Sequence, residues 1–224
     1  MPLRRFASRA ALDRALAERL ARASRERGNA IMLAGGTTPA PAYAMLAARG
    51  VEAAQDLRVL YSDERHVPSS SAASNFHLSE PLLAALALPS AQVLRVRTEL
   101  ALDEAARDYE EGLQRLCEAR IRIGLGLLGL GADGHTASLF TPAHLAASRA
   151  HLAVAVQRPD GRSAVSVTPE FLARIEEVLF VVAGADKAAA LARLQARDPQ
   201  LTAWRAVADC AAVQLWADEE AAPP

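Results

Sequence analysis

The chain has 224 residues, of which 51% are hydrophobic and 23% are charged, and it carries a formal net charge of −1. This composition favours an ordered globular protein over a disordered one. The near-zero net charge argues against general binding to nucleic acid or to a membrane surface, and no apolar run approaches the ~20 residues that a membrane-spanning helix requires.

The first half of the chain alternates between helical and strand patterns. Leucines at positions 12, 16 and 20, separated by arginines and acids, predict an amphipathic helix over 10–27. The later elements in this half are a strand at 30–33, a helix from Pro39 to Arg49, a strand at 57–61, a polar loop at 62–74 and a helix capped by Asn75.

The second half adds more strands to the same alternation. The pattern predicts helices at 102–119 and 186–196, a frayed tail at 218–224, and strands at 93–96, 123–130, 152–156, 164–168, 178–182 and 212–216. Such alternation predicts an α/β fold, a three-layer sandwich around a mostly parallel, Rossmann-like sheet. We find no repeat and no linker, so we expect a single domain over residues 1–224.

Three loops directly follow predicted strands: Ala34–Thr38, Ser62–Asn75 and Gly131–Phe140. In an open parallel sheet, ligands bind beyond the carboxyl ends of the strands. We therefore expect these loops to share one edge of the sheet and to form a site there.

The first loop contains Gly35, Gly36, Thr37 and Thr38 ahead of a predicted helix. The glycines permit a sharp turn and a close approach to a ligand, and the threonines add hydroxyl donors. The amino end of the following helix favours an anion such as phosphate. The alternative interpretation is a plain strand-to-helix turn, and the lysine of a Walker loop is absent.

The other two loops supply charged and titratable side chains. Asp63 and Arg65 stand at a strand end, where they could form a solvated charge cluster or help to bind a ligand. His135 follows Asp133 by two residues, and a histidine can exchange protons near neutral pH while a nearby aspartate fixes its orientation. His66 is a secondary candidate.

The sequence does not predict a dinucleotide site or a metal site. Gly124, Gly126 and Gly129 have the spacing of a dinucleotide-binding loop, but they lie within a predicted strand and no acid follows about 20 residues later. Cys117 and Cys210 lie far apart and lack a metal-ligand spacing, which favours a reduced, cytoplasmic protein.

With these loops in hand, the chain resembles the 6-phosphogluconolactonase family, which shares a wider group with glucosamine-6-phosphate deaminase. The resemblance rests on four segments in family order: 34–39 (AGGTTP), 63–68 (DERHVP) with Ser74-Asn75, 130–140 (LGADGHTASLF) and 184–188 (GADKA). The third segment is the most specific, and together they cover the chain from about residue 30 to 190.

The resemblance implies an activity and residue roles. It implies hydrolysis of 6-phospho-D-glucono-1,5-lactone to 6-phospho-D-gluconate in the oxidative pentose phosphate pathway, with no required cofactor. By the same resemblance His135 is the catalytic base and Lys187 binds phosphate. The glycine-threonine loop would hold the phosphate, and Arg65 would help to place the substrate.

One departure concerns a phosphate-binding arginine that the family usually carries shortly before Thr/Ser-Leu-Thr on a strand. Here Ser166-Val167-Thr168 matches the end of that pattern, but Ala164 stands at the arginine position. Arg162 lies two residues earlier, a spacing that keeps a side chain on the same face of a strand. We therefore expect Arg162 to bind the phosphate, with Arg158 as a weaker substitute.

Within the wider group, the residues favour the lactonase. The deaminase has an acid at the place of Phe140 and a tyrosine at the place of Arg65, and amine chemistry needs that extra acid–base group. Residues 136–140 contain no carboxylate.

Two alternatives stay open. One is a sugar-phosphate isomerase or deaminase, and the other is a non-catalytic sugar-phosphate sensor. Against the sensor, Met1–Gly28 is too short for the DNA-binding helix-turn-helix that such regulators usually carry. Nothing in the sequence demands more than a monomer.

Overall fold

The computed structural model describes residues 1–223. Its first elements are β1 (Leu3–Phe6), α1 (Arg9–Arg25), β2 (Asn29–Leu33), α2 (Ala40–Arg49), β3 (Arg58–Tyr61), β4 (Asp63–Arg65), α3 (Asn75–Ala85), η1 (Ser90–Gln92), β5 (Val93–Leu94) and α4 (Leu102–Glu118). They are followed by β6 (Arg122–Leu128), α5 (Pro142–Ala147), β7 (Ala153–Gln157), β8 (Ser163–Val167), α6 (Pro169–Leu172), β9 (Val178–Val182), η2 (Ala185–Lys187), α7 (Ala188–Gln195), α8 (Thr202–Val207) and β10 (Val213–Asp218).

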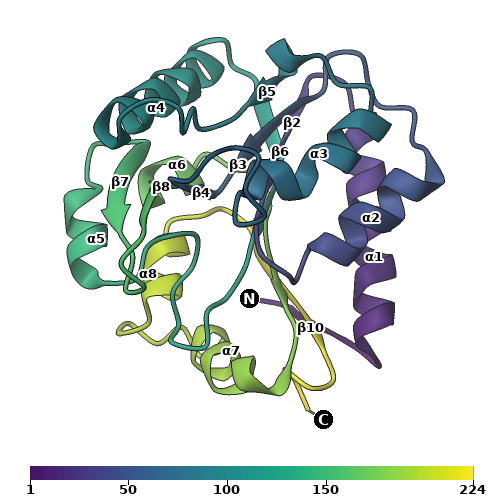
Figure 1. The fold of residues 1–224 in the computed structure, drawn as a ribbon. Helices are drawn as coiled ribbons and strands as arrows, with labels where there is room; N and C mark the ends of the chain where they lie inside the picture. The colour runs from purple at the N-terminus through teal and green to yellow at the C-terminus, as the bar shows by residue number, and fades with distance from the viewer. Residues whose placement is uncertain (224) are drawn as a thin grey trace.

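The central sheet has seven strands in the order β1-β10-β9-β6-β2-β3-β5, and every neighbouring pair is parallel. Helices α1, α2 and α3 cover one face, while α4, α7, α8 and a second sheet lie on the other (Figure 1). Alternate residues of β2 belong to the two cores, Ile31 to the first and Met32 to the second, as the two-residue period of a strand requires. The predicted three-layer α/β sandwich is confirmed.

The second sheet consists of three antiparallel strands in the order β4-β8-β7. The sequence predicts β7 and β8 but does not separate them from the central sheet. It also assigns β4 to a loop, which is wrong. The reason is that Asp63, Glu64 and Arg65 carry no apolar alternation, so their strand depends on pairing with β8 rather than on local preference.

Other departures are local. The strand β1 and the short helices α5, α6 and α8 have no counterpart in the prediction, and the predicted helix at 186–196 is a 3₁₀ turn followed by α7. Helix α3 is capped by Ser74, whose Oγ accepts the N–H of His77, rather than by Asn75.

The tail is not frayed over the part that the structure describes, and Pro224 lies outside the described residues. Asp218 is 1% exposed, and its carboxylate accepts the backbone N–H groups of Gly184 and Ala221. Ala221 and Ala222 are buried as a result. The sequence does not reveal this because Gly184 lies 34 residues before Asp218, in the loop after β9.

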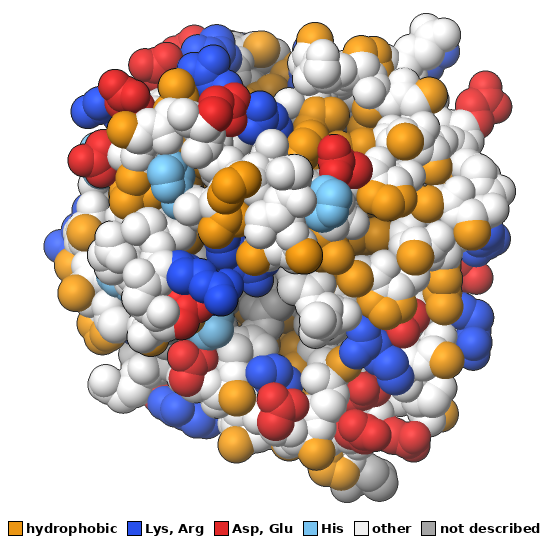
Figure 2. Space-filling view, viewed as in Figure 1, with side chains coloured by type: hydrophobic (Ala, Val, Ile, Leu, Met, Phe, Trp, Pro, Cys, Tyr) orange, Lys and Arg blue, Asp and Glu red, His pale blue; other side chains and the backbone are white. Residues whose placement is uncertain are grey.

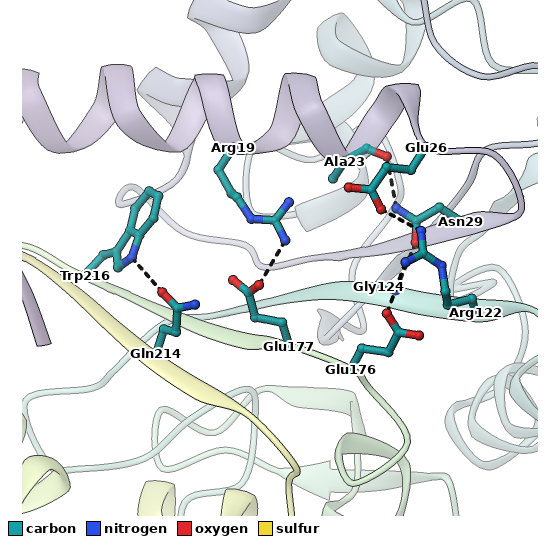
Figure 3. Close-up of polar contacts among 10 residues, drawn as sticks. All are labelled: Arg19, Ala23, Glu26, Asn29, Arg122, Gly124, Glu176, Glu177, Gln214 and Trp216. Carbon is teal, nitrogen blue, oxygen red and sulfur yellow. Dashed lines mark hydrogen bonds and ion pairs between the residues drawn. The ribbon is translucent and has the colours of Figure 1, made fainter. Parts of the chain in front are cut away.

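A polar network fixes the opposite end of the sheet, around the amino ends of β2 and β6 (Figure 3). The buried Asn29 donates to the carbonyl of Ala23 at 3.0 Å and accepts the N–H of Gly124 at 2.9 Å. Arg122 joins Glu26 at 2.6 Å to Glu176 at 3.1 Å. These contacts tie α1 to the sheet from the end away from the predicted site.

Candidate functional site

A cleft of ≈ 290 Å³ opens beyond the carboxyl ends of β2, β3 and β6. It is lined by all three predicted loops and by two cations from further along the chain: Ala34, Gly35, Gly36, Thr37, Thr38, Ser62, Asp63, Arg65, Asn75, Gly129, Leu130, Gly131, His135, Ala137, Arg158 and Lys187. In Figure 2 this face is hollowed near its centre, with basic side chains and a histidine around the hollow. The expectation that the three loops meet at one edge of the sheet is confirmed.

Size alone does not select this cleft, since a larger cavity of ≈ 520 Å³ lies beside Arg25, Arg27 and residues 52–56. That cavity contains none of the histidines and lies at no strand's carboxyl end. The cleft around His135 combines a titratable ring, three cations and a glycine loop. Such convergence of polar groups in one hollow is typical of a binding or active site.

The anion loop, residues 35–38, is shaped by close packing. A Cβ atom at Gly35 would lie 1.8 Å from Asn75 Oδ1, so only glycine fits there. Gly36 has a φ of +88°, a conformation that other residues rarely adopt. The hydroxyl of Tyr43 donates to the carbonyl of Ala34 at 2.7 Å and fastens the start of the loop to α2.

Asp63 lines the cleft, but its carboxylate already has partners. It accepts the hydroxyl of Ser62 at 2.9 Å and that of Ser138 at 2.7 Å, and it is only 7% exposed. Because Ser138 belongs to the histidine loop, Asp63 joins the second predicted loop to the third.

Glu64 is not among the candidate site residues that the sequence indicates, although it stabilises the start of α3 next to the cleft. It is 2% exposed and accepts the backbone N–H groups of Asn75 at 2.7 Å and Phe76 at 2.8 Å, together with the hydroxyl of Ser74 at 3.0 Å. Burial raises the pKa of this carboxyl above its usual value, and the hydrogen bonds offset only part of that effect. An acid that caps a helix eleven residues away has no local sequence signature.

Arg65 lies on the same short strand and lines the cleft. Its guanidinium donates to the carbonyl of Ala73 at 3.1 Å and to Asn75 Oδ1. These two contacts fix the direction of the arginine side chain at the wall of the cleft.

His135 is held from two sides. Its Nδ1 lies 2.5 Å from Asp133 Oδ1, and its ring stacks on Phe140 with centroids 4.0 Å apart. Gly131 leaves room for this arrangement, because a Cβ there would lie 2.1 Å from Nδ1. Since a carboxylate only accepts, Nδ1 carries a proton, and in the neutral imidazole Nε2 is then the nitrogen with the free lone pair.

The charge state of Asp133 supports this assignment. Partial burial alone would raise its pKa, but the hydrogen bonds from the His135 ring and backbone outweigh burial and hold the pKa below its ordinary value. Asp133 is therefore a carboxylate at neutral pH and keeps the imidazole in one tautomer.

The two cations from later in the chain reach the cleft by different routes. Lys187, in η2, lies 3.0 Å from Asp186 and has a side chain that is 25% exposed. Arg158, at the turn after β7, donates to Ser138 Oγ at 3.1 Å and lies over the ring of Phe140 at 4.9 Å from its centroid. Phe140 thus contacts both His135 and Arg158 without itself lining the cleft.

The structure does not bring Arg162 to the cleft. Arg162 is exposed and lies in the turn before β8, where its backbone N–H donates to Asp160 at 3.1 Å. Its expected position relied on the two-residue period of a strand, but β8 begins only at Ser163, so that period does not extend to residue 162. Arg158, the weaker substitute by sequence, is the arginine that lines the cleft.

The remaining histidines have structural partners. His66 Nε2 lies 2.9 Å from the carbonyl of Leu100, and His151 lies 3.2 Å from Glu110. His144 Nδ1 accepts the N–H of Phe140. Over residues 1–223, no group of three or more His, Cys, Asp or Glu side chains is arranged to hold a metal ion.

Comparison with known proteins identifies the family. A family model described as glucosamine-6-phosphate isomerases/6-phosphogluconolactonase matches residues 5–216. The chain belongs to this family. None of the helices described over residues 1–223 is long and apolar enough to cross a membrane.

Relatives within the family are similar in sequence and in fold. A 6-phosphogluconolactonase of Synechocystis is 35% identical over 193 residues, which cover 81% of this chain and 79% of the relative. The crystal structure of the 6-phosphogluconolactonase of Thermotoga maritima is 27% identical, with a TM-score of 0.77 and coverage of 96% and 97%. A monomeric glucosamine-6-phosphate deaminase superposes with a TM-score of 0.84 at 18% identity, so the fold alone does not separate the two activities.

Proposed function

We propose that this protein hydrolyses 6-phospho-D-glucono-1,5-lactone to 6-phospho-D-gluconate, the second step of the oxidative pentose phosphate pathway, with His135 as the general base. The observation that carries the proposal is that His135 and the anion loop at residues 35–38 line one cleft. The curated relatives named 6-phosphogluconolactonase support the choice of substrate.

The cleft can hold both ends of this substrate. The phosphate binds at the loop of Gly35, Gly36, Thr37 and Thr38, close to the positively charged amino end of α2. Lys187 and Arg158 neutralise its charge, and charge-assisted hydrogen bonds of this kind are stronger than neutral ones. Anchoring the phosphate places the lactone carbonyl next to His135 and so contributes through orientation.

The chemistry uses the free lone pair of His135 Nε2. This nitrogen takes a proton from water as the water oxygen bonds to C1 of the lactone, which forms a tetrahedral oxyanion. Arg65 and nearby backbone N–H groups stabilise that negative charge. The intermediate then breaks the bond between C1 and the ring oxygen, and the imidazolium returns its proton to that oxygen. Asp133 stabilises the imidazolium between the two proton transfers.

The absence of a further acid next to His135 supports hydrolysis over deamination. The segment 136–140 holds no carboxylate, and the ring of Phe140 packs against the imidazole at a centroid distance of 4.0 Å. Lactone hydrolysis requires one base, one water and an oxyanion site, all of which the cleft can supply. No metal or organic cofactor enters this scheme.

The test is turnover of enzymatically generated 6-phosphogluconolactone by the purified protein, followed as acid release above the rate without enzyme. We expect turnover that is at least ~100-fold above the spontaneous rate, the contribution typical of one general base. Ammonia release from glucosamine 6-phosphate would instead support a deaminase. Tight binding of 6-phosphogluconate without either reaction would support a sugar-phosphate sensor.

We further propose that the protein works as a monomer and in the cytoplasm. One chain supplies every residue that lines the cleft, so catalysis as proposed needs no second copy. The two free cysteines, Cys117 and Cys210, are consistent with a reducing compartment. The prediction of one domain over residues 1–224 is part of this proposal.

A further inference from the structure

Arg9 contacts the anion loop from outside the cleft. It is the first residue of α1, and its Nη2 atom donates to the carbonyl oxygens of Thr37 at 3.2 Å and Thr38 at 2.7 Å. Its Nε atom donates to Asp13 Oδ1 at 2.8 Å. The two threonines line the cleft, whereas Arg9 does not. One guanidinium therefore joins the first turn of α1 to the outer side of the loop.

The loop needs such a contact because two successive residues lack side chains. Glycine has more backbone freedom than any other residue, so Gly35 and Gly36 alone would leave the loop in many conformations. The hydroxyl of Tyr43 holds the carbonyl of Ala34 at the start of the loop. Arg9 provides the second attachment, at the end of the loop, where the chain enters α2.

The contact with Thr37 also sets the direction of a hydrogen-bond donor. In a trans peptide, the carbonyl of residue 37 and the N–H of residue 38 lie in one plane and point in opposite directions, and the described chain has no cis peptide. While Arg9 holds the Thr37 carbonyl, the Thr38 N–H must point away from Arg9. A donor that is fixed before binding costs less free energy when a ligand arrives.

Asp13 orients the guanidinium of Arg9 toward the loop carbonyls. The aspartate lies one turn further along α1, is 5% exposed, and pairs with Nε of Arg9. This pairing leaves Nη2 for the loop carbonyls and offsets the charge of the guanidinium. The effect of Arg9 on a bound phosphate is therefore one of loop geometry rather than of direct contact.

We propose that Arg9 is a positioning residue for phosphate binding: it holds the anion loop in the conformation that accepts the phosphate of the substrate. This inference rests on the proposed function, because it takes residues 35–38 as the phosphate site. According to this inference, α1 contributes to substrate affinity although none of its residues lines the cleft.

The experiment compares Arg9→Ala, Arg9→Lys and the control Arg14→Ala, an exposed arginine of the same helix. The readouts are KM and kcat for 6-phosphogluconolactone and the Kd of 6-phosphogluconate by calorimetry. We expect Arg9→Ala to raise KM and Kd about tenfold with kcat within about twofold, as for loss of one charge-assisted hydrogen-bond set. Lysine should restore part of the loss, because its ammonium can donate to a carbonyl but cannot also pair with Asp13 in the fork geometry.

Two results would overturn the inference. One is a KM and Kd for Arg9→Ala within twofold of the wild type. The other is a fall in kcat with KM unchanged, which would show that Arg9 supports the general fold rather than the conformation of the anion loop. Lys187→Ala separates this from failure of the proposed function. If Lys187→Ala weakens binding and Arg9→Ala does not, only the inference on Arg9 fails. If the wild-type protein neither turns over the lactone nor binds 6-phosphogluconate, the proposed function fails and the role of Arg9 with it.

Discussion

His135 Nδ1 lies 2.5 Å from Asp133 Oδ1, a contact between residues only two positions apart that is possible because Gly131 presents no side chain to the imidazole. The short glycine-rich turn thus contains the ring, its orienting carboxylate and the space for both. The ring is also stacked on Phe140, so its plane and its tautomer are both set before a substrate binds.

Replacing Asp133 with asparagine tests the orienting role. Asp133→Asn keeps the shape of the side chain but removes the charge that stabilises the imidazolium. We expect kcat to fall about 100-fold with KM within about twofold, measured by steady-state acid release. A wild-type kcat in this variant would remove Asp133 from the mechanism.

Lys187 is expected to contribute to affinity rather than to chemistry. Lys187→Ala should raise KM about tenfold while kcat changes by less than about threefold, because the ammonium binds the phosphate equally in the ground state and the transition state. Arg193→Ala is the matched control, since Arg193 lies on the following helix and does not line the cleft. An unchanged KM for Lys187→Ala would exclude it from the phosphate site.

Arg158 and Arg162 provide a paired test of the departure from the family pattern. Arg158→Ala should raise KM about five- to tenfold, since it removes a cation from the cleft wall. Arg162→Ala, which removes an exposed arginine at the other end of the same turn, should leave KM unchanged. The opposite ranking of the two variants would show that the turn rearranges when substrate binds.

The raised pKa of Glu64 predicts that the stability of the fold depends on pH. Its folded pKa is raised by burial, so the folded state binds a proton more readily than the unfolded state. The resulting stabilisation is present below the unfolded pKa and is lost as pH rises through the folded pKa. The free energy of unfolding of the wild type minus that of Glu64→Gln should therefore be larger at about pH 4 than at about pH 7.5.

The measurement is urea unfolding of both proteins at the two pH values. Subtraction cancels the titration of the groups that both proteins share. A difference that stays constant, or that grows with pH, would contradict a raised pKa at Glu64.

The sequence predicts the central sheet well because its information is local. β9 is a continuous apolar run, β2 is apolar from Ala30 to Leu33, and the leucines of α1 recur at helical spacing. The three loops follow from topology once the strands are known to be parallel. The site at their convergence was therefore predictable from the printed residues and the rule for open α/β sheets.

Features that depend on partners far away in the chain could not be predicted from the sequence. Glu64 is a helix cap only because β4 runs beside the start of α3, and Asp218 is buried only because Gly184 lies against it. The cleft position of Arg158 depends on where the turn between β7 and β8 begins. A one- or two-residue difference in a strand boundary decides which of the two arginines lines the cleft.

The most direct measurement of the central claim is the lactonase activity of purified His135→Ala, compared with the wild type and with the rate without enzyme. We expect kcat to fall by about 10²–10⁴-fold, while calorimetric binding of 6-phosphogluconate stays within about threefold and the circular dichroism spectrum is unchanged. Hydrolysis of the lactone by a folded His135→Ala protein at the wild-type rate would contradict the account.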